Sequence, residues 1–322
     1  MDKIKTKIKL VFVPYLIISL STLIGWTFLH WLFFVDFNIY QGIIMIIVPS
    51  VLSLTLILIW LYKRIKLLSI KSERIVWYLL VPCLTMGGLS LFGQQYFDLT
   101  NSKLTHISSI SQIDKEEPTK FYTLKNFYLD KKHFSIKKQF KASGKHMQNL
   151  VMHVYITVPI LNSVKDTLGT NCIAWYGIKY TGTVYDFGYN HDINGIRDEI
   201  DINKNLYAYY YSSINQIENS DEVNRFIKEN MTNFDYLNIN HFLYLNRISK
   251  TESDYDNYVL AIKNNAKYDT KSDVVLLPVN ESLTERANDN LMAALAIFGV
   301  GSLLFLIMVI SPKLKSEDEI LK

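Results

Sequence analysis

Four long apolar runs are the feature of this sequence that most constrains its fold. A helix needs about 20 mostly apolar residues to cross the hydrocarbon core of a bilayer, which spans about 30 Å. Four segments satisfy this length, and they cover residues 10–35, 43–62, 76–97 and 291–310. A buried helix of a soluble protein needs only about 10–14 apolar residues. The sequence therefore predicts an α-helical membrane protein, with three transmembrane helices before a long intervening region and one after it.

The composition excludes several other classes of protein. Only 20% of the 322 residues are charged and 49% are hydrophobic, whereas an ordinary soluble domain carries about 25% charged residues. A wholly soluble enzyme and a disordered chain are therefore excluded. Two cysteines are too few for a disulfide framework, and a net charge of +4 does not indicate a nucleic-acid partner. The partner that the apolar runs require is the lipid bilayer.

Lysine and arginine in the short loops predict the orientation, because cytoplasmic loops carry an excess of both. They occur at residues 3–9, 63–74 and 313–322, whereas the link at 36–42 between the first two runs has none. This pattern predicts that both termini are cytoplasmic and that the long region between the third and fourth runs lies outside the cytoplasm.

The expected domain organisation is a membrane region at residues 1–98, an extracytoplasmic domain at 99–288, and the fourth span with a short tail at 289–322. Aromatic and β-branched residues predict strands in the outer domain, at residues 120–130, 134–140, 150–160, 172–180, 242–248 and 274–279. The first two of these are expected to pair as a hairpin. Because strands and predicted helices do not alternate regularly, we expect an α+β domain rather than a doubly wound sheet.

Charge is divided along the outer domain. Residues 99–165 hold 11 lysine or arginine residues and 4 acidic residues, whereas residues 186–256 hold 6 and 13. The two halves either complement each other and solvate the surface, or the basic stretch at 120–145 faces anionic headgroups or an acidic partner. Exposed charges are more often solvating than specific.

One polar segment resembles a calcium-binding loop of twelve residues. It spans residues 190–201 and places oxygen-bearing side chains at loop positions 1, 3, 5, 9 and 12, namely Asn190, Asp192, Asn194, Asp198 and Asp201. Gly195 occupies position 6, where calcium loops turn sharply. Asn at position 1, Asp at position 12 and Arg197 at position 8 depart from the usual pattern. The segment is therefore either a calcium site or a polar loop rich in turn-forming residues.

Catalytic motifs are absent from the sequence. The histidines do not show zinc-ligand spacing, and no phosphate-binding or dinucleotide-binding glycine motif follows a predicted strand. The run Gly88-Leu89-Ser90-Leu91 lacks the glycine after serine that an intramembrane serine protease would need, and no acidic pair lies in a span. An enzyme would have to assemble its site from scattered residues of the outer domain: His146, His153, Cys172, His191 and Asp192.

Several segments together resemble a known bacterial family. They are residues 28–34 (FLHWLFF), 59–68 (IWLYKRIKLL), 121–130 (FYTLKNFYLD), 143–146 (SGKH), 175–179 (WYGIK), 279–285 and 298–308 (FGVGSLLFLIM). Over residues 8–312 the chain resembles the N-terminal, non-catalytic region of certain long proteins of the rhomboid family. In those proteins a unit of three spans, an outer domain and one span precedes the rhomboid core. The Gly-x-Ser-Gly motif and the catalytic histidine of that core are absent here, so the resemblance assigns no catalytic residue.

The resemblance implies an accessory or regulatory module that works beside a separate membrane protease, in a bacterial cytoplasmic membrane. We expect the outer domain to bind a protein, a peptide or an envelope component, without catalysis and without a cofactor other than the calcium considered above. A membrane-bound enzyme with its site in the outer domain is the alternative. A channel or transporter is less favoured, because the spans lack the buried charges that ion pathways usually need.

Overall fold

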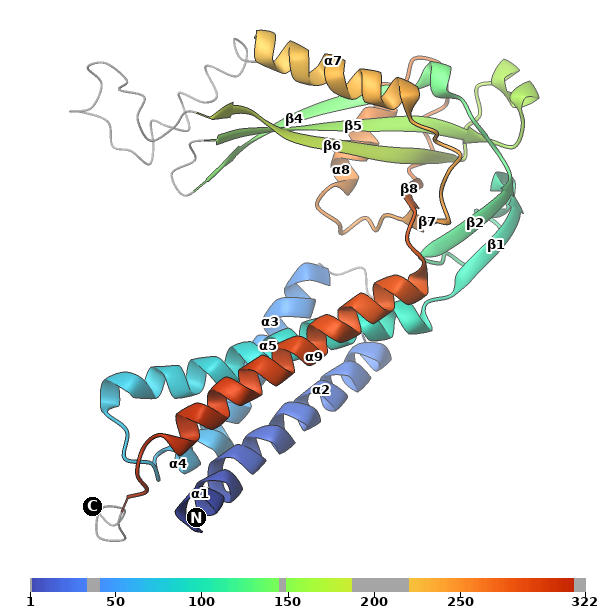
Figure 1. Ribbon diagram of the computed structural model, residues 1–322. Coiled ribbons are helices and arrows are strands. Elements are labelled where there is room, and N and C mark those ends of the chain that lie inside the picture. Colours follow the sequence, from blue (N-terminus) through green and yellow to red (C-terminus); the bar gives the residue numbers. More distant parts are fainter. Residues whose placement is uncertain (1, 34–40, 145–148, 187–219, 316–322) are drawn as a thin grey trace, which may run out of the picture. The chain divides into compact units, whose positions relative to one another are not determined.

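The computed structural model describes residues 2–33, 41–144, 149–186 and 220–315 (Figure 1). The chain divides into two compact units. The helical unit comprises residues 1–102 and 281–322, and the sheet unit comprises Lys103–Asn280. The chain therefore passes from the helical unit into the sheet unit and returns to the helical unit.

Four helices of the described chain are long and apolar enough to span a membrane, as predicted. The first combines α1 (Asp2–Lys7), the π-helical turn η1 (Ile8–Phe12) and α2 (Val13–Phe33). The second combines α3 (Gln41–Leu56), the π-helical turn η2 (Ile57–Leu61) and α4 (Tyr62–Ile65). The third and fourth are α5 (Ser72–Asn101) and α9 (Leu283–Ile310).

Helix α9 begins eight residues before the apolar run that predicts it. The hydroxyl of Ser282 accepts a hydrogen bond from the backbone N–H of Glu285, and the Glu285 carboxylate accepts one from the backbone N–H of Ser282. This capping box satisfies two backbone donors that a helix start leaves unpaired. Hydropathy marked the apolar part of the helix, whereas local hydrogen bonding determines where the helix begins.

A cluster of buried apolar side chains packs one end of the helical unit. It joins Val11 and Tyr15 with Ile57, Leu61 and Phe305, which come from four different helical segments. The rings of Tyr15 and Phe305 lie 4.7 Å apart between centroids. The Tyr15 hydroxyl also lies 3.1 Å from Ser302 Oγ on α9, so its polar atom is not left unpaired.

The sheet unit contains an eight-stranded mixed sheet. Its strands are β1 (Leu104–Ser109), β2 (Phe121–Asn126), β3 (Tyr128–Leu129), β4 (Ser135–Ser143), β5 (Asn149–Leu161), β6 (Ala174–Asp186), β7 (Tyr244–Arg247) and β8 (Val275–Val279). The strand order is β1-β2-β7-β8-β6-β5-β3, and β4 also pairs with β5. Short 3-10 turns in the described part of this unit are η3 (Ile110–Gln112), η4 (Lys131–His133) and η5 (Val164–Leu168).

Both faces of the sheet are buried at its centre, because one helix covers each face (Figure 1). Alternate residues of β5 point to opposite faces. Met152, Val154 and Ile156 join the cluster that includes residues of α7 (Asp221–Tyr236). Tyr155 joins the cluster that includes residues of α8 (Tyr255–Lys263). The unit thus has three layers, with α7 and α8 on opposite sides of the sheet.

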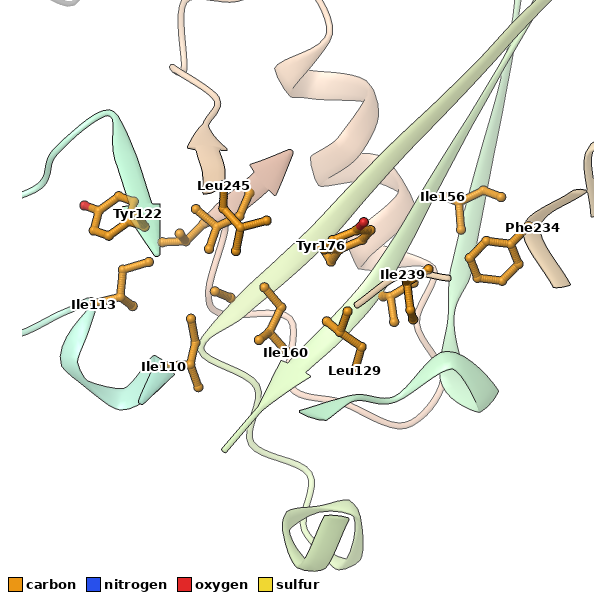
Figure 2. Packing of buried hydrophobic residues seen from close by; sticks show 14 of the residues in the cluster. Ile110, Ile113, Tyr122, Leu129, Ile156, Ile160, Tyr176, Phe234, Ile239 and Leu245 are labelled. Atoms are coloured by element: carbon orange, nitrogen blue, oxygen red, sulfur yellow. The ribbon is translucent and has the colours of Figure 1, made fainter. Parts of the chain in front are cut away.

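The larger of the two clusters extends along the sheet toward its edge. Figure 2 shows Ile156, Ile160, Tyr176 and Phe234 among its members. Ile110, on η3, belongs to the same cluster, so the crossover after β1 is packed against the sheet. The apolar core therefore reaches the turn between β5 and β6.

The predicted hairpin between residues 120–130 and 134–140 is wrong. Strand β2 pairs with β1 and β7, whereas β3 and β4 follow one another along the same edge of β5. Alternation of apolar and polar residues shows which face of a strand is buried but not which strand is its partner. No strand was predicted at β1. This strand pairs with β2 and lies at the end of the strand order.

Gly177 on β6 packs closely against Tyr258 of α8 and against β8. A Cβ atom at this position would lie 2.7 Å from Leu277, 2.9 Å from Tyr258 and 2.9 Å from Val275. We expect Gly177→Ala to lower the free energy of unfolding by about 1–3 kcal/mol through overpacking. For a unit of this size, each kcal/mol lowers the melting temperature by about 2–4 °C.

Thermal unfolding of the full chain in detergent measures this effect. Gly169→Ala is the control, because its Cβ would meet only the Asp166 carbonyl oxygen at 3.6 Å. Equal melting temperatures for the two variants would contradict the packing described around Gly177.

Candidate functional site

Most of the residues singled out in the sequence lie outside the described residues. This holds for the calcium-like loop, Asn190, Asp192, Asn194, Asp198 and Asp201, and for His146 and His191. The calcium site therefore stays a prediction. In the described part of the chain, no three histidine, cysteine or acidic side chains gather as a metal site would require.

His153 and Cys172, the two described members of the predicted enzyme set, lie far apart. His153 lies opposite Thr181 in the β5–β6 ladder, whereas Cys172 precedes Ala174, which lies opposite Ile160. Seven residues of strand at about 3.3 Å each separate these positions by roughly 20 Å. Cys172 is buried, and burial raises the pKa of its thiol to about 12. A protonated thiol at this distance does not form a nucleophile–base pair with His153.

The structure instead brings together a polar group around Asp254, at the start of α8. The Asp254 carboxylate accepts hydrogen bonds from the Tyr155 hydroxyl at 2.8 Å and from Lys179 Nζ at 2.9 and 2.8 Å. Burial by itself raises the pKa of Asp254, but these hydrogen bonds and the charge of Lys179 outweigh it, so the pKa is lowered. The carboxylate therefore holds the N-terminus of α8 against β5 and β6.

A second polar group surrounds Asp130, which lies between β3 and η4 and is 1% exposed. Its carboxylate accepts hydrogen bonds from His133 Nδ1 at 2.7 Å and from the Tyr268 hydroxyl. Lys267 Nζ lies 3.6 Å away. Burial raises the pKa of Asp130, but the bonds from Tyr268 and His133 and the nearby positive charges outweigh it and lower the pKa. Neither Tyr268 nor Lys267 could be connected with Asp130 from the sequence, since they follow it by more than 130 residues.

A buried carboxylate that orients an imidazole is also the basic half of many hydrolytic sites, and the His133 side chain is 41% exposed. The described contacts around His133 instead hold the chain after α8 in place. Asn265 Nδ2 donates to the His133 carbonyl oxygen at 2.7 Å, and Asn264 Nδ2 donates to the Ile136 carbonyl oxygen at 3.0 Å. Both asparagines follow α8, so the Asp130 group fixes the C-terminal end of that helix as Asp254 fixes its start.

The described part of the sheet unit has an open cleft beside the β5–β6 turn, with a volume of about 360 Å³. Its floor is apolar and is formed by Ile110, Ile160, Leu161 and Ile173. Ile110 and Ile160 are also members of the core cluster in Figure 2. Ligand sites of this size are typically lined by apolar side chains with a few polar groups. The floor of the cleft is therefore a part of the core that reaches the surface.

The rim of the cleft is polar and comes from the turn itself. It contains Asn162, Lys165, Asp166 and Asn171. Asp166 accepts a hydrogen bond from the backbone N–H of Ser163 at 2.9 Å, which closes η5. The backbone N–H of Ser111 donates to Asn162 Oδ1 at 3.4 Å, which links η3 to the rim. The charged side chains of the rim are Lys165 and Asp166.

Two apolar side chains of η5 extend into solvent beside this rim. Leu168 is 93% exposed and Val164 is 61% exposed. Exposed apolar side chains next to a cleft are typical of interaction surfaces. This site could not be predicted from the sequence, because residues 162–171 carry no ligand-binding motif and are joined to Ile110 only by the fold.

Comparison of the chain with protein-family models, with curated proteins and with solved structures finds no match. The resemblance to the rhomboid-associated region therefore stays a prediction. The class that the fold defines is an α/β sheet unit joined at both ends to helices of membrane-spanning length.

The acid stability of the sheet unit follows from its shifted pKa values. Burial, reinforced by Lys179 and Lys141, lowers the pKa of His153 below its ordinary 6.5. The unfolded chain then binds a proton at His153 first, so stability falls as pH decreases from 6.5 to the lowered pKa. The pKa values of Asp130 and Asp254 lie below 3.8, and their contribution is lost only as pH falls through those lower values.

We therefore expect two separate losses of stability as the pH is lowered. The measurement is urea unfolding of the full chain at each pH, with hydrogen exchange of β5 peptides as the readout. The first occurs below pH 6.5 and the second below about pH 4. His153→Gln should remove the first loss and leave the second. Persistence of the first loss in that variant would contradict the assignment to His153.

Proposed function

We propose that this protein is a membrane-anchored accessory or regulatory module. In this proposal the sheet unit lies outside the cytoplasm and binds a protein, a peptide or an envelope component without catalysis. A membrane protease is the partner that the rhomboid-like resemblance suggests. The cleft beside the β5–β6 turn is the observation that carries the proposal, because it combines an apolar floor, a polar rim that contains Lys165 and Asp166, and exposed apolar side chains next to it.

The short connections to the helical unit support membrane anchoring of the sheet unit. Helix α5 ends at Asn101 and β1 begins at Leu104, while β8 ends at Val279 and α9 begins at Leu283. Each connection therefore has only two or three residues, and a residue spans at most about 3.6 Å. The sheet unit is therefore joined directly to two helices of membrane-spanning length.

Contacts within the helical unit support cytoplasmic placement of both termini. Lys7 Nζ donates to the Ile310 carbonyl oxygen at 2.6 Å, and Arg64 donates to the Leu10 carbonyl oxygen at 3.2 Å. The backbone N–H of Ser69 donates to the Lys313 carbonyl oxygen. The N-terminus, the basic link after α4 and the C-terminal segment therefore meet at one end of the unit. The excess of lysine and arginine there matches the pattern of cytoplasmic loops.

The partner-binding proposal predicts site-specific crosslinking. A photoreactive phenylalanine analogue at Leu168 should crosslink a membrane or envelope protein in native membranes. The same analogue at Lys228, an exposed position on α7, is the control. Mass spectrometry identifies the crosslinked protein. Identical products at both positions, or none at Leu168, would contradict the proposal.

Reversing the charge of Lys165 tests whether the rim contributes to binding of the same partner. Lys165→Glu should lower the yield of the Leu168 crosslink at least five-fold if the partner presents an acidic or acceptor group to the rim. Lys228→Glu makes the same change in net charge away from the cleft and should leave the yield unchanged. Catalytic turnover by the purified protein, lost on His133→Ala, would favour the enzyme alternative instead.

A further inference from the structure

The helical unit is divided along its length into an apolar part and a polar part. The apolar cluster around Tyr15, Ile57 and Phe305 lies near the end where the termini meet. Toward the other end, where α5 leads to the sheet unit, the buried positions of α2 and α5 are largely polar. The polar ones are Thr22, Thr27 and His30 on α2 and Ser90 and Gln94 on α5, and the apolar Trp26, Leu89 and Leu99 are buried in the same part.

Helices α2 and α5 run in the same direction in this polar part. Trp26 Nε1 donates to Gln94 Oε1 at 2.9 Å, and His30 Nδ1 lies 3.9 Å from Asp98 Oδ1. The two residues of each pair are 68 positions apart in the sequence. Moving one turn along α2, from Trp26 to His30, therefore corresponds to moving one turn along α5, from Gln94 to Asp98. Gly93 permits this approach, because a Cβ there would lie 2.6 Å from Leu23.

Thr27 follows Trp26 on α2, and Ser90 lies one turn before Gln94 on α5. Three buried polar atoms of these residues have no partner among the described residues. They are Thr27 Oγ1, Ser90 Oγ and Gln94 Nε2. Ser90 and Gln94 are each 1% exposed, and Thr27 is 9% exposed. The indole N–H of Trp26 can only donate, so the amide atom that it meets must be oxygen. The Gln94 amide nitrogen is therefore the atom left without an acceptor.

The hydroxyls of Ser19 and Thr22, also on α2, do have hydrogen-bond partners. Ser19 Oγ donates to the Tyr15 carbonyl oxygen at 2.8 Å, and Thr22 Oγ1 donates to the Ile18 carbonyl oxygen at 2.7 Å. Such bonds to the preceding turn satisfy a hydroxyl within its own helix. Thr27 and Ser90 make no such bond, and a buried polar group without a partner is costly away from water.

We propose that Thr27, Ser90 and Gln94 form a water-binding site inside the helical unit, which bulk water reaches past His30 and Asp98. Water supplies the acceptor that Gln94 Nε2 requires and can donate to or accept from the two hydroxyls. The Asp98 side chain is 25% exposed, so the polar path begins at the surface. The apolar cluster closes the opposite end, so the site is a pocket of water rather than a continuous pore. This proposal does not depend on the partner of the sheet unit.

Cysteine reactivity in the detergent-solubilised full chain tests water access. Ser90→Cys should react with a small charged methanethiosulfonate reagent at least ten-fold faster than Met86→Cys. Met86 is the matched control, since it is one turn away on α5, 0% exposed and part of the apolar cluster. Mass spectrometry of peptides resolves each site from the native Cys83 and Cys172. Equal rates at the two positions would overturn the proposal.

Hydroxyl-radical footprinting of the unmodified chain in ¹⁸O-labelled water gives a test that needs no variant. Radicals formed from bound water should oxidise Trp26, which is only 2% exposed, several-fold faster than Trp175, which is 0% exposed in the sheet unit. Gln94→Leu should reduce the labelling of Trp26. Protection of Trp26 equal to that of Trp175 would show a dry site and overturn the proposal.

Discussion

The antiparallel pairing of β5 with β6 is the interaction on which the rest of the sheet unit depends. The two strands are the longest of the described sheet, and their ladder runs from Asn149–Asp186 to Ile160–Ala174. Because both faces of this ladder are buried, α7 and α8 each have an apolar surface to cover. The far end of the ladder carries the turn that forms the rim of the cleft. The candidate binding site is therefore positioned by the most extensive hydrogen bonding in the unit.

The polar groups of the sheet unit hold a short helix in a defined place. Helix α8 has nine residues, and helices of that length are marginal in isolation. Asp254 ties its first turn to Tyr155 and Lys179, while asparagines after its last turn bond to the chain around η4. Carboxylates with lowered pKa values therefore need not indicate catalysis, because structural ion-pair networks lower pKa values in the same way.

The anchoring carboxylates of the sheet unit and the Gln94 amide of the helical unit differ in how fully they are paired. In the sheet unit, the carboxylates of Asp130 and Asp254, which anchor α8, each have hydroxyl and ammonium partners. In the helical unit, Gln94 satisfies Trp26 with its oxygen while its nitrogen has no described protein partner. Helices α2 and α5 approach each other closely at Gly93. Small side chains allow such close helix packing, but they bring few donors or acceptors to pair with Gln94. Hydration of that region is the consequence that we infer.

The sequence by itself determined the four long apolar helices and the approximate positions of most strands, because hydropathy and alternation are local properties. It did not determine that β4 pairs with β5, that Asp130 meets Tyr268, or that Ile110 lies in the same cleft as Lys165. The β4–β5 pairs join residues 6 to 22 positions apart, and the other two contacts join residues 138 and 55 positions apart. Hydropathy and alternation do not specify these partners. Only the tertiary structure decided them, because strand partners and buried polar contacts are selected by packing of the whole unit.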